Sequence, residues 1–208
     1  MTLVKICGIT NLEDALSAVS AGADALGFNF YRPSSRYIEP HAAQSIIAQL
    51  PPHVLTVGVF VNEETPEAVE NIANAAGVKA IQLHGDESPA FSNALSHRYV
   101  IKVFPVAPGF NPQSTLKYAV TAHMVDAFDP QSRGGTGRIV DWSLARSVQQ
   151  LVPRLFLAGG LTVENVGEAI TQVRPYAVDA CSSLEVRGGK KDAERVRAFI
   201  EAAHRVKP

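Results

Sequence analysis

Residues 4–30 read VKICGITNLEDALSAVSAGADALGFNF, and this stretch decides the fold. Its two ends, Val4–Ile9 and Ala25–Phe30, are short β-rich apolar runs of the kind that form buried strands. The segment between them, Glu13–Ser20, carries its apolar residues at three- and four-residue spacings, as a helix with one buried face does. Asn11 precedes two acidic residues and predicts the N-cap of this helix. The chain therefore opens with a strand–helix–strand unit.

The same alternation continues along the rest of the chain. Further strands are predicted at Leu55–Val61, Ala80–His84, Tyr99–Phe104, Met124–Phe128, Leu155–Gly159 and Ala177–Cys181. Further helices are predicted at His41–Leu50, Pro66–Ala76, Pro89–His97, Gln113–Val120, Ser143–Leu151, Val163–Val173 and Asp192–Ala203. Thr65 before Pro66 and Thr162 before Glu164 predict two more N-caps.

Repeated strand–helix units predict parallel strands joined by right-handed crossovers. Eight such units are enough to close on themselves, so the pattern favours an α/β fold in which residues 1–208 form a single-domain (β/α)8 barrel, or TIM barrel. An open doubly wound sheet is the competing architecture. That sheet usually has fewer strands and a Gly-rich turn after the first strand, which this sequence lacks.

The composition of the chain argues against nucleic-acid binding, membrane binding and a disulfide-stabilised fold. The formal net charge of -1 gives no general field for nucleic acid or an anionic membrane, so neither is expected as a partner. Two cysteines are too few for a disulfide scaffold and favour a reducing compartment. Since no signal peptide and no apolar run of membrane-spanning length are evident, we expect a cytoplasmic protein. The composition does not choose between a monomer and a homodimer.

In a barrel of this type the active site lies in the loops that follow the strands. Gly159-Gly160 and Ser182-Ser183 follow the seventh and eighth strands, where backbone N–H groups commonly bind phosphate. Ser183–Val186 could form the accompanying short helix. The loop Gly134–Gly137, with Gly135, could cover the same phosphate or act as a flexible lid.

Cys7 and Asp126 are candidates for proton transfer. Cys7 stands at the end of the first strand, and a thiol needs only a modest shift in its pKa to act as a base at neutral pH. A buried small hydrophobe is the ordinary alternative for such a cysteine. Asp126 lies within a predicted strand and could supply the proton, while Asp129 is one step beyond, next to Pro130. Spacing alone does not separate the two aspartates.

Arg36 and His84 are predicted to lie at the same mouth of the barrel. An arginine there can form a fork of hydrogen bonds with a substrate carboxylate, although a solvated loop charge is the plainer interpretation. His84 is a candidate for substrate binding, but a single histidine at a strand end is more often a structural hydrogen-bond partner. No second histidine or carboxylate has metal-ligand spacing, so no metal site is expected.

At these residues the chain resembles the phosphoribosylanthranilate isomerase family from end to end. The matching segments are Lys5–Thr10, Gly27–Phe30, Ser35–Ile38, Val57–Asn62, Gln82–Gly85, Gly134–Gly137, Asp141-Trp142, Leu157–Leu161, Glu164–Val166, Val178-Asp179 and Gly189–Asp192. The resemblance implies an Amadori rearrangement of N-(5'-phosphoribosyl)anthranilate without a cofactor. Asp126 would be the acid, Cys7 the base, Arg36 the carboxylate ligand, and the glycine loops the phosphate ligands.

One segment departs from the family pattern. Where the family more often reads Val-Asp-Val-Ser-Ser-Gly-Val-Glu, residues 178–185 read VDACSSLE. Ser183 therefore replaces a glycine. It would cost about a kcal/mol or more if the position needed a positive φ, or it would serve as an N-cap and hydroxyl donor in the first turn of a short helix, the interpretation we favour. Cys181 stands where serine is usual and is interpreted as structural.

Two other functions compete. A related barrel that isomerises an aminoaldose in histidine synthesis would have a carboxylate in place of Cys7 and a longer chain. A non-catalytic barrel would bind a sugar phosphate without turnover, and its binding would survive Cys7→Ser.

Overall fold

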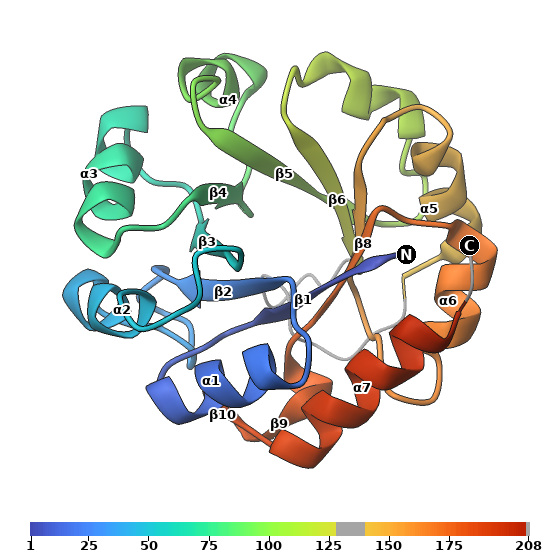
Figure 1. The fold of residues 1–208 in the computed structure, drawn as a ribbon. Coiled ribbons are helices and arrows are strands. Elements are labelled where there is room, and N and C mark those ends of the chain that lie inside the picture. Colours follow the sequence, from blue (N-terminus) through green and yellow to red (C-terminus); the bar gives the residue numbers. More distant parts are fainter. Residues whose placement is uncertain (128–139, 207–208) are drawn as a thin grey trace.

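The computed structural model describes residues 1–127 and 140–206 (Figure 1). Eight parallel strands form a closed barrel, in which each strand pairs with the next and the last pairs with the first. They are β1 (Leu3–Cys7), β2 (Ala25–Asn29), β3 (Leu55–Phe60), β4 (Ala80–Leu83), β5 (Tyr99–Val106), β6 (Ala122–Ala127), β7 (Leu155–Leu157) and β8 (Ala177–Ala180). The predicted (β/α)8 barrel is confirmed, and the open sheet is excluded.

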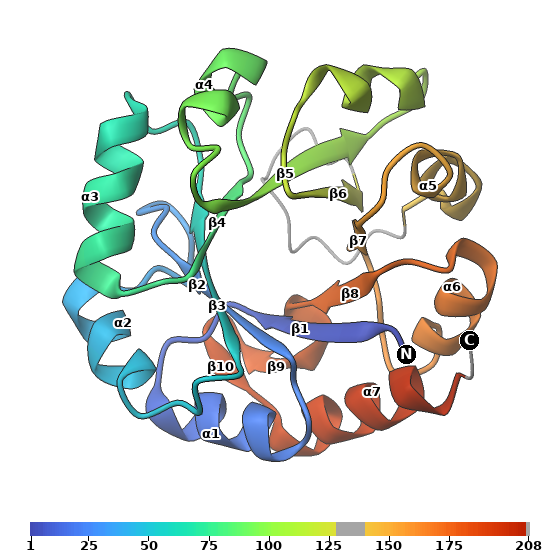
Figure 2. The same ribbon diagram turned by 45° about the horizontal axis from the view of Figure 1, so that its top comes forward.

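Helices surround the barrel on all sides in both ribbon views (Figures 1 and 2). They are α1 (Leu12–Ser20), α2 (Pro40–Ile47), α3 (Pro66–Ala76), α4 (Pro89–Ala94), α5 (Trp142–Gln149), α6 (Val166–Val173) and α7 (Ala193–Arg205). Asn11 and Thr65 cap α1 and α3 as predicted, since their side chains accept hydrogen bonds from the backbone N–H groups of Asp14 and Ala68. None of the described helices is long and apolar enough to cross a membrane.

The structure corrects several helix predictions, and α4, predicted to reach His97, ends at Ala94. The segment predicted as a helix over Gln113–Val120 is a short 3-10 helix, η1 (Pro112–Lys117). Here Ser114 and Thr115 donate their hydroxyls to the carbonyls of Asn111 and Pro112, and such local bonds compete with α-helical ones.

A further correction concerns α6, which begins at Val166 rather than at Val163. Thr162 is therefore not its N-cap. The Asn165 amide donates to the carbonyl of Gly160 and accepts from the N–H of Thr162, at 2.9 and 2.8 Å. These two bonds hold the residues before α6 in a turn.

The core has two parts. The larger one lies between the strands and the helices and contains most of the buried aliphatic side chains. The smaller one is formed by strand residues, with Ala158 just after β7, and lies inside the barrel. Because side chains alternate along a strand, the inward positions of β6 include Met124 and then Asp126. The same alternation directs Ala177 and then Asp179 inward on β8.

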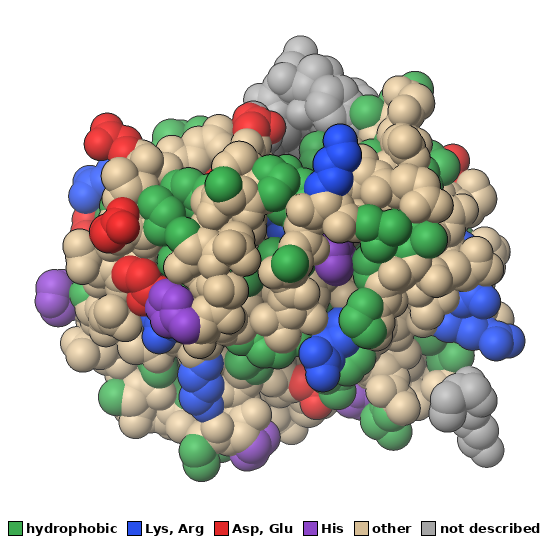
Figure 3. Space-filling model, turned by 90° about the horizontal axis from the view of Figure 1, so that it is seen from above, with side chains coloured by type: hydrophobic (Ala, Val, Ile, Leu, Met, Phe, Trp, Pro, Cys, Tyr) green, Lys and Arg blue, Asp and Glu red, His purple; other side chains and the backbone are tan. Residues whose placement is uncertain are grey.

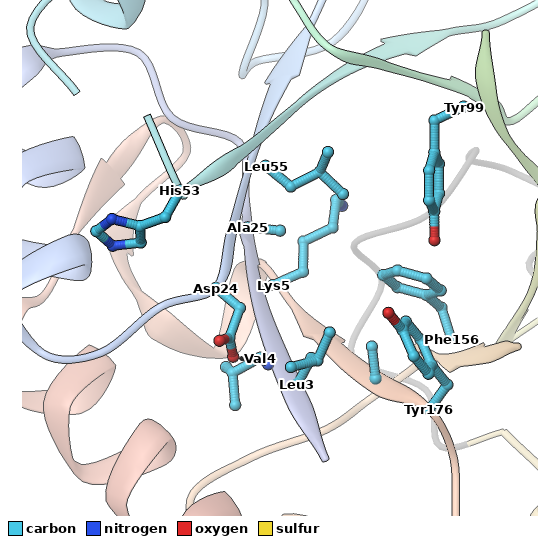
Figure 4. A pocket seen from close by; sticks show the side chains of 11 residues that line it. Leu3, Val4, Lys5, Asp24, Ala25, His53, Leu55, Tyr99, Phe156 and Tyr176 are labelled. Atoms are coloured by element: carbon cyan, nitrogen blue, oxygen red, sulfur yellow. Dashed lines mark hydrogen bonds between the residues drawn. The ribbon is translucent and has the colours of Figure 1, made fainter. Parts of the chain in front are cut away.

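A cavity opens at the amino ends of the strands, where Leu3, Ala25, Leu55, Tyr99 and Ala177 are the first residues of five of them (Figure 4). Conserved chemistry in barrels of this kind occurs at the other end, in the loops that follow the strands. On the face shown in Figure 3, acidic and basic side chains are both scattered among apolar ones. This mixed surface agrees with the small net charge of the chain.

Candidate active site

The adjacent strands β1 and β8 carry the buried side chains that lie below the site. Lys5 and Asp179 are direct register partners on these strands, and Lys5 Nζ lies 2.7 Å from Asp179 Oδ1. Lys5 is completely buried, and the neighbouring Asp179 carboxylate holds the pKa of Lys5 above its ordinary value although burial alone would lower it. Burial raises the pKa of Asp179 to about 7. An ion pair therefore closes the barrel beneath the catalytic end.

Cys7 lies directly above this ion pair, two residues along β1 on the same inward face. The hydrogen bond with the Cys181 thiol lowers the pKa of Cys7 well below the ordinary value of a cysteine. The positive charges of Lys5 and Lys191 act in the same direction, against the effect of burial. The surroundings of Cys7 therefore favour the thiolate, the form in which a cysteine accepts a proton.

Cys181, which the sequence led us to interpret as structural, is thus a neighbour of the candidate base. Replacing it by alanine removes the thiol donor, so we expect the pKa of Cys7 to rise. Cys181→Ser keeps a hydroxyl donor and should keep the pKa near that of the parent. The pH dependence of iodoacetamide alkylation at Cys7 measures the shift, with Cys181→Ser as the matched control. A midpoint that is the same in the alanine variant as in the parent would contradict the assigned donor.

Arg36 enters the site from the loop after β2 and is held by Glu185. Its Nε lies 2.9 Å from Glu185 Oε1 and its Nη2 lies 2.8 Å from Oε2, a two-point contact. Lys191 Nζ lies 2.9 Å from Oε1 of the same carboxylate. Although burial disfavours the charged carboxylate, Arg36 and Lys191 hold the pKa of Glu185 below its usual range. The guanidinium is therefore fixed in place, with Nη1 still directed away from this contact.

Lys191 and Glu185 belong to a hairpin that the sequence analysis did not predict. After β8 the chain forms the 3-10 helix η2 (Ser182–Leu184) and the antiparallel strands β9 (Glu185–Arg187) and β10 (Lys190–Lys191). The predicted short helix over Ser183–Val186 is therefore shorter and begins one residue earlier. Asp14 of α1 holds the hairpin, because its carboxylate accepts from Lys190 Nζ and from the N–H of Lys191.

Asp126 projects into the barrel from β6 and is buried. Its Oδ2 lies 3.3 Å from His84 Nε2, and its Oδ1 accepts the N–H of Ala127 at 2.8 Å. Gln82 Nε2 lies 3.1 Å from His84 Nδ1, so the imidazole stands between the Gln82 amide and the Asp126 carboxylate. His84 is thus a close neighbour of Asp126. Asp129 lies outside the described residues.

A buried charge cluster fixes the loop that follows His84. Lys102 Nζ lies 2.7 Å from Glu87 Oε2 and 2.7 Å from the carbonyl of Gly85. Glu87 also accepts the N–H groups of Gly85 and Asn62. These bonds join the segments after β3 and β4 to Lys102 of β5, and so hold the backbone next to His84 in place.

The predicted phosphate residues come together in part. Gly159 and Gly160 both have positive φ, at 86° and 66°, and follow β7. Ser182 and Ser183 form the start of η2, and the N–H groups of Gly160, Ser182 and Ser183 donate to no acceptor among the described residues. Gly135 lies outside the described residues.

The two interpretations of Ser183 are now separated. Its φ is not positive, so the strained alternative is excluded, and it lies within η2 while Cys181 occupies the N-cap position. Its hydroxyl donates to the carbonyl of Leu161 at 2.6 Å. The serine therefore ties the loop after β8 to the loop after β7.

Gly159 is required by its backbone and by its neighbours. A Cβ at this position would lie 2.5 Å from the backbone nitrogen of Ala127, whereas a Cβ at Gly77, with φ of 72°, would meet nothing within 4 Å. We expect Gly77→Ala to lower the free energy of unfolding by about 1–2 kcal/mol through φ alone. Gly159→Ala should lose about 1–3 kcal/mol more through overlap. Urea unfolding of both variants tests the difference, and equal losses would refute it.

The sequence analysis assigned no role to Lys5, Asp179, Glu185 and Lys191. A signal existed for the first two, because a charged residue inside an apolar strand run must face the barrel interior if its neighbours face the helices. No comparable signal marked Glu185 or Lys191. Among the described residues, no group of three or more His, Cys, Asp or Glu side chains is arranged to hold a metal ion.

The chain is similar to known proteins over almost its whole length. A family model described as N-(5'phosphoribosyl)anthranilate (PRA) isomerase matches residues 4–202. The N-(5'-phosphoribosyl)anthranilate isomerase of Geobacter sulfurreducens is 49% identical over 203 residues, which is 98% of each chain. The crystal structure of phosphoribosyl anthranilate isomerase from Thermotoga maritima superposes with a TM-score of 0.92 at 44% identity, covering 98% of this chain and 99% of that one.

A further solved phosphoribosyl anthranilate isomerase, in complex with reduced 1-(o-carboxyphenylamino)-1-deoxyribulose 5-phosphate, has a TM-score of 0.88 and 43% identity. It covers 98% of this chain and 99% of its own. The family model spans nearly the whole barrel, including β1 with Cys7 and the β9–β10 hairpin. The chain belongs to the N-(5'-phosphoribosyl)anthranilate isomerase family.

Proposed function

We propose that Cys7 is the general base and Asp126 the general acid in the isomerisation of N-(5'-phosphoribosyl)anthranilate. The activity itself, which yields 1-(2-carboxyphenylamino)-1-deoxyribulose 5-phosphate in tryptophan biosynthesis, follows from the family. One observation carries the assignment of roles. Both side chains face inward at the carboxyl ends of their strands, and the Cys7 thiol has a lowered pKa.

The reaction needs an acid at the furanose ring oxygen and a base at sugar C2. Asp126 donates a proton to the furanose ring oxygen, and the ring opens to a Schiff base. The Cys7 thiolate then removes the proton from sugar C2, and the electron pair moves toward the nitrogen to give an enolamine. The enolamine then gains a proton at C1 and loses the proton of its C2 hydroxyl, which gives the ketoamine product. His84, whose Nε2 lies 3.3 Å from Asp126 Oδ2, stabilises the Asp126 carboxylate after it has lost its proton.

Arg36 and the loops after β7 and β8 hold the two anionic ends of the substrate in this proposal. The Nη1 edge of Arg36, left over from the contact with Glu185, binds the anthranilate carboxylate. The N–H groups of Gly160, Ser182 and Ser183 bind the phosphate, as backbone donors in this part of a barrel commonly do. Gly159 provides the close approach, and Gly135, which follows β6 in the sequence, would contribute as well.

The same proposal covers the wider setting of the enzyme. No cofactor takes part, because the substrate nitrogen serves as the electron sink. Residues 1–208 act as one isomerase domain in the cytoplasm, a compartment in which thiols are ordinarily reduced. A relative from Thermotoga maritima, 40% identical with a TM-score of 0.86, is described as dimeric, so a homodimer is the oligomer to test beside the monomer.

A fluorescence assay tests the activity and the rival functions together. Freshly prepared N-(5'-phosphoribosyl)anthranilate fluoresces through its anthranilate ring, and the signal should fall as the enzyme turns it over. Loss of signal that depends on enzyme concentration supports isomerisation. A stable signal at micromolar enzyme would refute it, and binding of the substrate in that case would favour a non-catalytic sugar-phosphate module.

A further inference from the structure

The two cysteines of the chain meet at the catalytic end of the barrel. Ile6 and Ala180 are the last register partners of β1 and β8. Cys7 is the last residue of β1, and Cys181 is the first residue after the end of the adjacent strand β8. Neighbouring strands lie about 4.8 Å apart, within the separation of roughly 4.4–6.8 Å between Cα atoms that a disulfide spans. The backbone therefore places the two residues at bonding distance for a disulfide.

The side chains point the same way as well. Lys5 and Asp179 face each other inside the barrel, and Cys7 and Cys181 follow each of them by two residues. The two thiols are hydrogen-bonded to each other, and both are free. Glycines stand beside both sulfurs: a Cβ would lie 2.7 Å from Cys7 Sγ at Gly27 and 3.0 Å from Cys181 Sγ at Gly8. The absence of side chains there leaves the sulfurs room to approach.

The surroundings favour oxidation of Cys7 as the first step, because the pKa of Cys7 is lowered while that of Cys181 is raised by the hydrogen bond with Cys7 and by burial. Lys191 Nζ lies 3.8 Å from Cys181 Sγ, and Lys5 and Lys191 both support negative charge on Cys7. Cys7 is 9% exposed and Cys181 is partly exposed, at the end of the barrel that must admit a substrate. A small oxidant can follow the same route.

We propose that Cys7 and Cys181 are a reversible oxidation site for a hydroperoxide, which switches the isomerase off by closing a disulfide. The Cys7 thiolate attacks one oxygen of hydrogen peroxide, breaks the O–O bond and releases hydroxide, leaving Cys7 as a sulfenic acid. The Cys181 thiol then attacks this sulfur, forms the S–S bond and releases water. In total, two thiols lose two electrons and two protons, and one peroxide is reduced to two water molecules.

Loss of activity on closure rests on the proposed function, because it requires Cys7 to be the base. In a disulfide the Cys7 sulfur is neutral and is not a base. It cannot accept the C2 proton, so turnover should stop when the bond forms. Dithiothreitol should restore it by exchange. The second cysteine also limits damage, because a sulfenic acid captured as a disulfide does not proceed to the irreversible sulfinic and sulfonic acids.

Intact mass and peptide mapping test the site without reference to activity. The purified full chain is treated with a small excess of hydrogen peroxide and then divided, with one portion reduced. We expect the oxidised protein to lose two hydrogen atoms in mass, both thiols to disappear together, and a cross-linked peptide pair containing Cys7 and Cys181. Cys181→Ser is the matched variant: it should instead gain oxygen at Cys7 and recover less with dithiothreitol than the parent does.

The outcomes separate the two proposals. An oxidised protein that gains oxygen without cross-linking, or that forms disulfides only between molecules, overturns the switch and leaves the catalytic roles untouched. An internal disulfide with activity down about tenfold or more, restored on reduction, supports both. An internal disulfide with full activity confirms the oxidation site but overturns Cys7 as the base.

Discussion

Replacing Cys7 by serine lowers the kcat of the isomerase by a factor of about 10²–10⁴, the usual contribution of a positioned acid or base. The hydroxyl of serine fills the same space and can still form a hydrogen bond. Its pKa is far above that of a thiol, so Lys5 and Lys191 cannot generate an alkoxide near neutral pH. Steady-state fluorescence kinetics measure the loss. The KM should change much less than kcat, because the substrate anions are held elsewhere.

Asp126→Asn provides the parallel case. It keeps the size of the side chain and the contact with His84 but removes the proton donor, so a loss of about 10²–10⁴ in kcat is expected again. Circular dichroism and urea unfolding of both variants control for misfolding. If either folded variant retains a kcat near that of the parent, the role assigned to that residue is wrong.

The second large effect concerns stability. Lys5→Met leaves the Asp179 carboxylate buried without its cation, and breaking a buried pair in this way costs about 3–5 kcal/mol. The pKa of Asp179 is already raised to about 7 by burial, and loss of Lys5 raises it further. A raised carboxyl pKa means that the folded state holds a proton that the unfolded state has lost, so stability falls as pH rises through that window. The variant should therefore be more strongly destabilised at about pH 8 than at about pH 5.

Urea unfolding at both pH values measures this difference, and a double variant is its control. Lys5→Met with Asp179→Leu removes both charges and should recover most of the lost stability, since an apolar pair in such a position is often neutral or better. A single variant as stable as the parent, or a double variant no better than the single, would contradict the assigned importance of the ion pair.

Much of the fold was predictable from periodicity. Each strand of the barrel lies within a few residues of its predicted position, because a buried parallel strand needs a continuous apolar run that is visible in one short window. The predictions were less accurate where side chains compete with the backbone for hydrogen bonds. Around η1, serine and threonine hydroxyls bind nearby carbonyls and replace the expected α-helix, and before α6 the Asn165 amide holds a turn.

The sequence predicted which residues belong to the candidate site better than it predicted which side chains they contact. Strand position directed Cys7 and Asp126 to the catalytic end, but Arg36 was expected to be available to a substrate and is bound by Glu185, 149 positions away. Lys5 and Asp179 are 174 positions apart. No local pattern specifies which charges will meet across the barrel, since such contacts arise only when the ring of strands closes.

The pairing of the first strand with the last also bears on how the polypeptide is made. Synthesis is vectorial, and a ribosome releases β1 long before β8 and the β9–β10 hairpin exist. Until those last segments emerge, Cys7 lacks the neighbours that create its thiolate, namely Cys181 and Lys191. Through most of translation, the Cys7 thiol of the nascent chain therefore has an ordinary pKa. Cys181 and Lys191 lower that pKa only after the last segments have been made and the barrel has closed.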